Sequence, residues 1–228
     1  MIIYGKQVCL YALQKHEAKI ETVYIAKKGI LPQALYEQYR EKIKFLENRW
    51  AQAMSKGGNH QGLLVEMSDI TPASLEQIKQ GSFLVVLDGL TDAGNIGAIT
   101  RTAYALGVDG IIATGVKQLP FAAIARTSSG ALLDMPFRIQ HNILDMLNEL
   151  GQIGFTSYGA SMEGEAVEEM FFAQKRVLVL GSEDRGISKK AKSRLDKSVS
   201  IRMKRAFDSL NVSAAASILI HRMGYATK

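Results

Sequence analysis

The spacing of apolar residues changes at Ser82, and from there onward short apolar blocks alternate with longer amphipathic stretches. Residues 83–87 form an almost continuously apolar block, which is typical of a strand whose two faces are both covered. The pattern predicts further strands at residues 110–114, 137–139, 155–160, 176–180 and 199–201. It predicts helices or helical turns at residues 96–106, 122–133, 143–150, 165–171, 188–195 and 212–223. Such alternation predicts an α/β domain built on a parallel sheet.

The first seventy residues predict a separate small α/β module. The pattern favours a helix at residues 7–15, strands at 21–26 and 62–67, a turn at 56–60 and a long amphipathic stretch at 33–54. One face of that stretch gathers the apolar side chains of Leu35, Tyr39, Ile43, Leu46, Trp50 and Ala53. We therefore divide the chain into a module at residues 1–68, a linker at 69–81 with room for one short helix, and a second domain at 82–228.

The last apolar stretch follows a polar segment that contains Asp208, Ser209, Asn211 and Ser213. Ser and Asn before an apolar run predict a helix start, because their side-chain oxygens accept the unpaired amide hydrogens of the first turn. Residues 212–223 are nearly all small or apolar, so this helix is expected to be buried on most sides. The pattern fits an ordinary capped core helix as well as a helix whose entrance points polar groups at a ligand.

Three of the predicted strands end in turns that are rich in glycine and polar residues. These turns are residues 88–95, which lead to Arg101, residues 181–186, and residues 202–211. In parallel α/β sheets, ligands bind beyond the carboxyl ends of the strands. We therefore expect the three turns to form one ligand site.

Composition narrows the chemistry of that site. The net charge is +6, and residues 185–228 hold 11 Lys and Arg against 2 Asp and Glu. Such clustering suits a phosphate-bearing partner, although a solvated basic face without a partner gives the same count. The single cysteine, Cys9, excludes a disulfide framework, and the four histidines lack metal-ligand spacing, so no metal is predicted. Dinucleotide, phosphate-loop and nucleophile-elbow motifs do not occur. Without a recognisable signal peptide or membrane span, we expect a cytoplasmic protein with no membrane partner.

Residues 95–103, 178–183 and 209–214 resemble, in order and spacing, the three motifs of the SpoU (TrmH-like) RNA ribose 2′-O-methyltransferases. Residues 1–5 and 60–62 resemble the ribosomal-protein-like RNA-binding extension of the RlmB-like branch, which methylates a guanosine ribose in large-subunit (23S) ribosomal RNA. The resemblance implies methyl transfer from S-adenosylmethionine to a ribose 2′-hydroxyl of ribosomal RNA. A transfer RNA methyltransferase, or a non-catalytic RNA-binding or ribosome-assembly factor on the same scaffold, stays open as an alternative.

The resemblance also implies a fold, an assembly and site residues. The implied fold is SPOUT-type, a parallel α/β sheet with a C-terminal trefoil knot, and the implied active unit is a homodimer. The cofactor is expected against Leu180, Gly181, Ile201, Met203 and Leu210. Catalytic roles fall to Asn95, Arg101, Glu183, Ser209 and Asn211. RNA contacts are expected from Tyr4, Lys6, His60, Arg126, Arg202, Lys204 and Arg205.

Two features of the implied site leave alternatives. The family proposal makes the arginine that matches Arg101 a general base, yet a guanidinium with a pKa above ~12 seldom releases its proton. Arg101 would then grip a phosphate beside the target ribose and stabilise the developing alkoxide. The family's Ile-Pro-Met-x-Gly loop reads Ile-Arg-Met-Lys-Arg at residues 201–205, which predicts a looser cofactor loop. Its added cations favour attraction of RNA, or a lineage that binds RNA without methylating it.

Overall fold

The computed structural model describes residues 1–205 and 208–225, and the chain divides into two compact units. Unit 1 comprises Met1–Thr71 together with Pro120–Asp134. Unit 2 comprises Pro72–Leu119 together with Met135–Lys228. The predicted division did not anticipate that residues 120–134 group with the N-terminal module. They do so because helix α6 (Phe121–Thr127) packs on β1 (Ile2–Tyr4) and on α1 (Lys6–Lys15).

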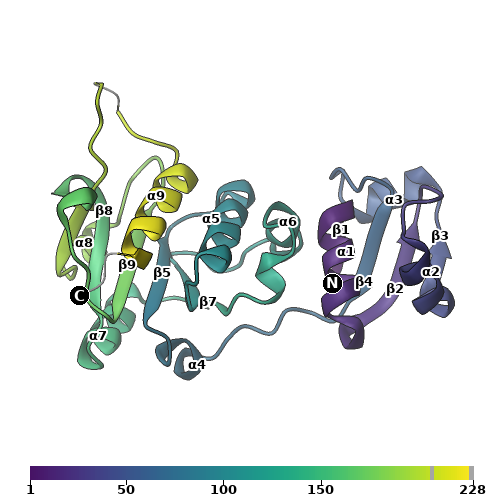
Figure 1. The fold of residues 1–228 in the computed structure, drawn as a ribbon, viewed down its shortest axis with the longest axis horizontal. Coiled ribbons are helices and arrows are strands. Elements are labelled where there is room, and N and C mark those ends of the chain that lie inside the picture. The colour runs from purple at the N-terminus through teal and green to yellow at the C-terminus, as the bar shows by residue number, and fades with distance from the viewer. Residues whose placement is uncertain (206–207, 226–228) are drawn as a thin grey trace. The chain divides into compact units, whose positions relative to one another are not determined.

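Unit 1 contains a mixed four-stranded sheet (Figure 1). Its strand order is β1-β4-β2-β3, where β2 is Ile20–Ile25, β3 is Ile43–Phe45 and β4 is Leu63–Met67. Strand β4 runs antiparallel to both β1 and β2, and β3 runs parallel to β2. The carboxyl ends of strands β1, β2 and β3 therefore all lie at the same end of the sheet.

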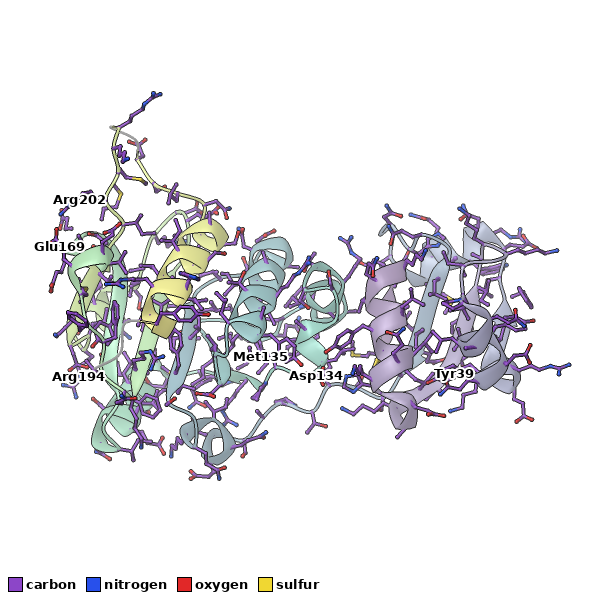
Figure 2. The ribbon with its side chains drawn as sticks, in the orientation of Figure 1. Tyr39, Asp134, Met135, Glu169, Arg194 and Arg202 are labelled. Carbon is purple, nitrogen blue, oxygen red and sulfur yellow. The ribbon has the colours of Figure 1, made fainter. Side chains whose placement is uncertain are left out.

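The stretch at residues 33–54 is not one amphipathic helix, so its predicted apolar face is wrong. It breaks into α2 (Gln33–Gln38), a 3₁₀ turn, β3 and α3 (Asn48–Met54). Tertiary structure causes this break, because the backbone groups of β3 form hydrogen bonds with β2 and not within a helix. Tyr39 is buried, and its hydroxyl donates to the carbonyl oxygen of Leu13 at 2.7 Å (Figure 2). Trp50, predicted to share that face, is 55% exposed.

Unit 2 contains a six-stranded sheet in which every pair of neighbours is parallel. The strand order is β10-β8-β9-β5-β6-β7. The strands are β5 (Phe83–Asp88), β6 (Gly110–Thr114), β7 (Phe137–Gln140), β8 (Thr156–Ala166), β9 (Arg176–Gly181) and β10 (Lys197–Ser200). Every residue of β5 and β6 is buried, as the continuous apolar blocks predicted. The predicted parallel α/β architecture is confirmed.

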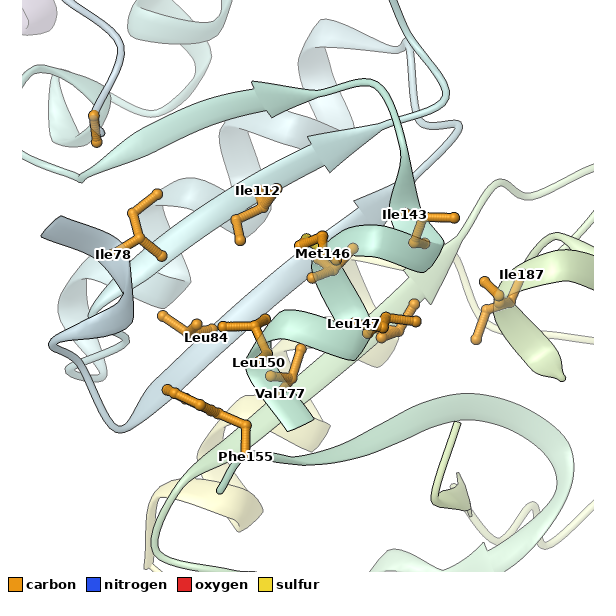
Figure 3. Close-up of a cluster of buried hydrophobic side chains, with 14 residues drawn as sticks. Ile78, Leu84, Ile112, Ile143, Met146, Leu147, Leu150, Phe155, Val177 and Ile187 are labelled. Atoms are coloured by element: carbon orange, nitrogen blue, oxygen red, sulfur yellow. The ribbon is translucent and has the colours of Figure 1, made fainter. Parts of the chain in front are cut away.

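Helices cover both faces of this sheet. On one face α7 (Ile143–Gln152) packs against α8 (Lys189–Lys192) and β8, while α4 (Leu75–Lys79) contributes Ile78 to the same core. There Leu84 and Val86 of β5 meet Met146 and Leu150 of α7 (Figure 3). Side chains alternate along a strand, so the intervening residues of β5 face the other layer. That layer consists of α5 (Ala93–Ala105) and α9 (Val212–Tyr225), which lie side by side.

Three predicted helices are shorter than expected, and the one predicted at residues 188–195 is reduced to α8. The helix predicted at residues 122–133 ends at Thr127, because Ser129 and Gly130 adopt left-handed φ values of 55° and 98° and a 3₁₀ turn, Ala131–Leu133, follows. The helical turn predicted at 165–171 is reduced to Val167–Glu169. Residues 165 and 166 extend β8 instead, since they pair with Val199 and Ser200 of β10.

The last helix begins at Val212 as predicted, but its expected burial on most sides is wrong. Its buried residues fall on one face, and they are Val212, Ala216, Leu219, Ile220 and Met223. Ile218, on another face, is 42% exposed. Residues 206 and 207, inside the predicted turn at 202–211, lie outside the described residues. Across the described part of the chain, the helices are too short or too polar to cross a bilayer.

Candidate active site

The candidate site begins where β5 ends and α5 starts. Asp92 caps α5, because its Oδ1 accepts the backbone N–H of Asn95 at 2.7 Å. This cap fixes Asn95 in the first turn of the helix, at the carboxyl end of the central strand. An aspartate side chain is among the strongly preferred caps at a helix N-terminus.

The Glu183 carboxylate joins three segments that are far apart in the chain. Its Oε1 accepts hydrogen bonds from Nδ2 of Asn211 at 2.7 Å and from Nδ2 of Asn95 at 3.3 Å. The backbone N–H of Val212 approaches the same oxygen at 3.4 Å. Asn211 Nδ2 also donates to Asn95 Oδ1 at 3.0 Å. We call this set of Asn95, Glu183 and Asn211 the three-segment junction.

Asn211 performs two tasks with the two ends of one amide. Its Oδ1 caps α9 by accepting the backbone N–H groups of Ser213 at 2.9 Å and Ala214 at 3.4 Å. Its Nδ2 faces the junction. The predicted helix cap and the predicted site residue are therefore the same side chain.

The other two predicted catalytic residues lie near the junction along the chain. Arg101 is exposed on α5, six residues beyond Asn95, which corresponds to about 9 Å along a helix axis. Ser209 is exposed two residues before Asn211. Helices α5 and α9 are also coupled beyond the junction, because the hydroxyls of Thr102 and Ser217 lie 3.3 Å apart.

The turn that carries Glu183 is sterically tight. A Cβ on Gly181 would lie 2.0 Å from the carbonyl carbon of Gly186 and 2.1 Å from the nitrogen of Ile187. The turn closes through the backbone N–H of Gly186, which donates to the Ser182 carbonyl at 2.8 Å. Only glycine fits at position 181, and this close return of the chain sets the direction of the Glu183 side chain.

Asp88 is a buried carboxylate whose role the sequence reasoning missed. It is 6% exposed and accepts the hydroxyl of Thr114 at 3.0 Å and the backbone N–H of Ser188 at 2.8 Å. These bonds tie the ends of β5 and β6 to the segment after the Glu183 turn. The available signal was an acidic residue that ends an otherwise apolar strand, a position where a buried charge requires partners.

The SpoU rRNA Methylase family model matches residues 82–221, which hold the whole junction. This chain belongs to the SpoU rRNA methylase family. A second model, described as RNA 2′-O ribose methyltransferase substrate binding, matches residues 2–72 of this SpoU-family chain.

Relatives of this SpoU-family chain align along nearly its full length. It is 29% identical to the 23S rRNA (guanosine-2′-O-)-methyltransferase RlmB of Neisseria meningitidis serogroup B, over 96% of this chain and 92% of that protein. It is 33% identical to an uncharacterized tRNA/rRNA methyltransferase of Archaeoglobus fulgidus, over 97% and 92%. The solved structure of the SpoU methyltransferase AviRb from Streptomyces viridochromogenes, in complex with the cofactor AdoMet, superposes with a TM-score of 0.76 at 24% identity, covering 98% of this chain and 89% of that one. The last comparison supports the fold.

The residues expected to hold the cofactor differ in exposure. Leu180 is 1% exposed, so it can offer a ligand only its backbone, as Gly181 must. Ile201, Met203 and Leu210 are partly exposed and present apolar surface. Apolar side chains with exposed surface, and backbone groups at a strand end, are the kinds of group that line sites for small ligands.

Four of the predicted RNA-binding residues belong to unit 1. The guanidinium of Arg126 lies over the Tyr4 ring, with its central carbon 5.6 Å from the ring centroid. The backbone N–H of Lys6 donates to Gln61 Oε1 at 2.8 Å. His60 is only 6% exposed, and its Nδ1 accepts the backbone N–H of Gly62 at 3.0 Å, which gives it a structural role in this turn.

The other three predicted RNA-binding residues follow β10 in unit 2. Arg202 forms a salt bridge with Glu169, and both side chains are largely exposed (Figure 2). Lys204 and Arg205 are exposed. Arg202 is therefore partly neutralised, whereas Lys204 and Arg205 present charge to solvent.

Cys9 does not have the properties of a nucleophile. Its thiol is fully buried, lies 3.6 Å from the Leu63 carbonyl oxygen, and belongs to unit 1 rather than to the junction. Burial raises the pKa of Cys9 well above its usual value, because a thiolate there would be desolvated. This disfavours a methyl transfer mechanism that requires a cysteine thiolate.

Proposed function

We propose that this chain transfers a methyl group from S-adenosylmethionine to the ribose 2′-hydroxyl of a guanosine in 23S ribosomal RNA. The observation that carries the proposal is the convergence of Asn95, Asn211 and Val212 on one oxygen of Glu183. Relatives named for that activity align along both units, and this favours ribosomal over transfer RNA as the substrate.

The junction orders the attacked ribose. When bound, S-adenosylmethionine supplies an electrophilic methyl group. Glu183 is exposed, so its carboxylate can accept a hydrogen bond from the nucleotide while the two amides hold it in place. Ser209 lies two residues before Asn211 and supplies a further hydroxyl near the junction. Positioning of this kind supplies a large part of the acceleration in transfer reactions.

Arg101 stabilises the negative charge that develops on the ribose oxygen. It is exposed on α5, where its side chain can reach a phosphate next to the target ribose. A guanidinium keeps its proton at neutral pH, so electrostatic stabilisation fits Arg101 better than a role as general base. The ribose proton then leaves to solvent or to another acceptor.

The cofactor is held by the backbone at Leu180 and Gly181 and by the apolar side chains of Ile201, Met203 and Leu210. The buried Leu180 side chain and the tight Gly181 turn support this assignment. Lys204 and Arg205, which belong to the cofactor loop, attract the RNA backbone and so compensate in part for the missing proline and glycine. A cytoplasmic location is consistent with a ribosomal RNA substrate.

We also propose a trefoil knot and a homodimer. The knot is supported by the path of the chain, since β10 lies at the edge of the sheet while α9, which follows it, packs on the central strand β9 and on α5. The dimer is supported by apolar side chains exposed on those two helices. Tyr104 is 45% exposed, Ile218 is 42% and Tyr225 is 75%.

The test is tritiated methyl transfer to RNA from a strain that lacks this protein, followed by mapping of the modified nucleotide. We expect incorporation into 23S ribosomal RNA at a ribose 2′-oxygen. Transfer to transfer RNA alone would overturn the substrate. Transfer to neither RNA, together with no S-adenosylmethionine binding at millimolar concentration in a calorimetric titration, would establish the non-catalytic RNA-binding factor instead.

A further inference from the structure

Unit 1 contains a cavity of about 250 Å³ at the carboxyl ends of the parallel strands β2 and β3. Ile25 and Phe45 are the last residues of these strands, pair in register and both line the cavity. Ile30, Leu31 and Tyr36, from the connection after β2 and from α2, complete its apolar wall. Ligands of α/β proteins commonly bind beyond the carboxyl ends of parallel strands.

The cavity combines aromatic rings with polar groups at its rim. Phe45 is 60% exposed, so a ligand in the cavity can reach its ring. Tyr36 supplies a second ring, and Lys28 and Gln33 supply the polar rim. The Gln33 amide donates to Glu37 at 2.7 Å, and this bond orients its plane. Rings that offer flat apolar faces, beside an amide and a cation, suit a planar base with polar edges.

The cavity lies at the same edge of the sheet as the Tyr4–Arg126 pair. Tyr4 pairs with Leu64 of β4, and Ile25 pairs with the adjacent Leu63. In the order β1-β4-β2-β3, Tyr4 and Phe45 are three strand spacings apart, or about 14 Å. Between them, the turn at Gly62 abuts Lys27, whose Cβ would lie 2.5 Å from a Cβ on that glycine.

We propose that this cavity receives a single unstacked nucleobase of the RNA substrate, stacked on Phe45. The inference rests on the proposed function and adds a base-binding site outside the catalytic unit. Proteins read single-stranded RNA mainly by stacking unpaired bases on aromatic side chains and by bonding the base edges. The adjacent Lys27 and Lys28, both exposed, place positive charge where the flanking phosphates would run, and this favours RNA over an apolar protein segment.

The test compares Phe45→Ala with Trp50→Ala in the full-length protein. Trp50 is a matched control, because it is 55% exposed in the same unit, is stacked with Arg49 and does not line the cavity. The probe is in vitro transcribed 23S ribosomal RNA in a filter-binding assay without cofactor. A base stack contributes ~1–3 kcal/mol, so Phe45→Ala should weaken binding about tenfold and Trp50→Ala less than twofold. Phe45→Trp should retain binding.

Ultraviolet cross-linking of the wild-type protein to the same RNA provides a second readout. We expect mass spectrometry to find a nucleotide on a peptide that contains Phe45 or Tyr36. The inference would be overturned if Phe45→Ala bound RNA with unchanged affinity and the wild-type protein gave no such cross-link. It would also be overturned if Phe45→Ala changed the oligomeric state of the protein and left RNA affinity unchanged. If the protein forms this cross-link but transfers no methyl group, the result would contradict the proposed function and still support the base-binding site.

Discussion

The two units build their candidate sites in opposite ways. In unit 2 one oxygen of Glu183 binds two segments that are distant in the chain, and each member of the junction is oriented by the others. In unit 1 the candidate RNA-binding groups are spread across the sheet at the carboxyl ends of β1, β2 and β3, from the Tyr4–Arg126 pair to the cavity at Phe45. A chemical step requires fixed geometry, whereas RNA binding sums many weak contacts. Single substitutions should therefore have large effects in the first site and small ones in the second.

The sheets of the two units differ in how deeply their strands are buried. The central strands of unit 2 are buried on both faces, so loops at their ends have a rigid base. Strand β3 of unit 1 is a short edge strand with an exposed Phe45. Rigid central strands suit catalysis, and an accessible edge suits capture of a flexible partner.

The largest effect should come from Arg101→Ala. Removing one donor that stabilises a developing oxyanion typically costs about 10²–10³-fold in rate, so methyl transfer should fall by about that factor. Cofactor affinity, measured by calorimetry, should stay near wild type because Arg101 acts on the ribose side. A tenfold loss of cofactor binding would instead assign Arg101 to the cofactor pocket.

Gly181→Ala should strongly impair the same unit for a steric reason. The new Cβ would meet backbone at 2.0 Å, so the turn that carries Glu183 must move. We expect a lower thermal midpoint and severely reduced methyl transfer. Gly151→Ala is the control, since that glycine lies in α7 with open space around its Cβ position. Normal activity and stability in Gly181→Ala would show that the turn does not set the geometry of the site.

Asn211→Ala should lose both tasks of its amide. Loss of a helix cap typically costs ~0.5–2 kcal/mol of unfolding free energy, and the junction loses its bridging donor. Asn211→Asp keeps the capping oxygen but replaces Nδ2 with an acceptor that faces Glu183. We expect chemical denaturation to show a smaller stability loss for Asn211→Asp, and both variants to lose activity. Retained activity in Asn211→Asp would show that methyl transfer does not require the Nδ2 donor of Asn211.

The smallest effect should come from Arg126→Ala in unit 1. An exposed cation–π pair contributes ~0.5–1 kcal/mol, so RNA affinity should fall about two- to fivefold with the rate at saturating RNA unchanged. Arg126→Lys keeps the charge and separates attraction of phosphate from stacking on Tyr4. A hundredfold loss of RNA affinity in Arg126→Ala would contradict the view that many weak contacts in unit 1 share the binding of RNA.

Much of unit 2 was predictable because local pattern and tertiary environment agree there. Continuous apolar blocks predicted buried parallel strands, and polar turns after those strands predicted where Asn95, Glu183 and Asn211 would meet. The break in residues 33–54 was not predictable, because pairing with β2 decides that Ile43–Phe45 is a strand. The buried role of Asp88 likewise depends on the backbone of Ser188, one hundred residues away.

The most direct test of the central claim, that the junction acts as one catalytic unit, is a double-mutant cycle on Asn95→Ala and Glu183→Ala. The measured quantity is the single-turnover rate of methyl transfer to 23S ribosomal RNA at saturating cofactor. Residues that act as a unit give non-additive losses. The account predicts a large loss in each single variant and a double variant within about threefold of the worse one. Losses that multiply, or single variants as fast as wild type, would contradict it.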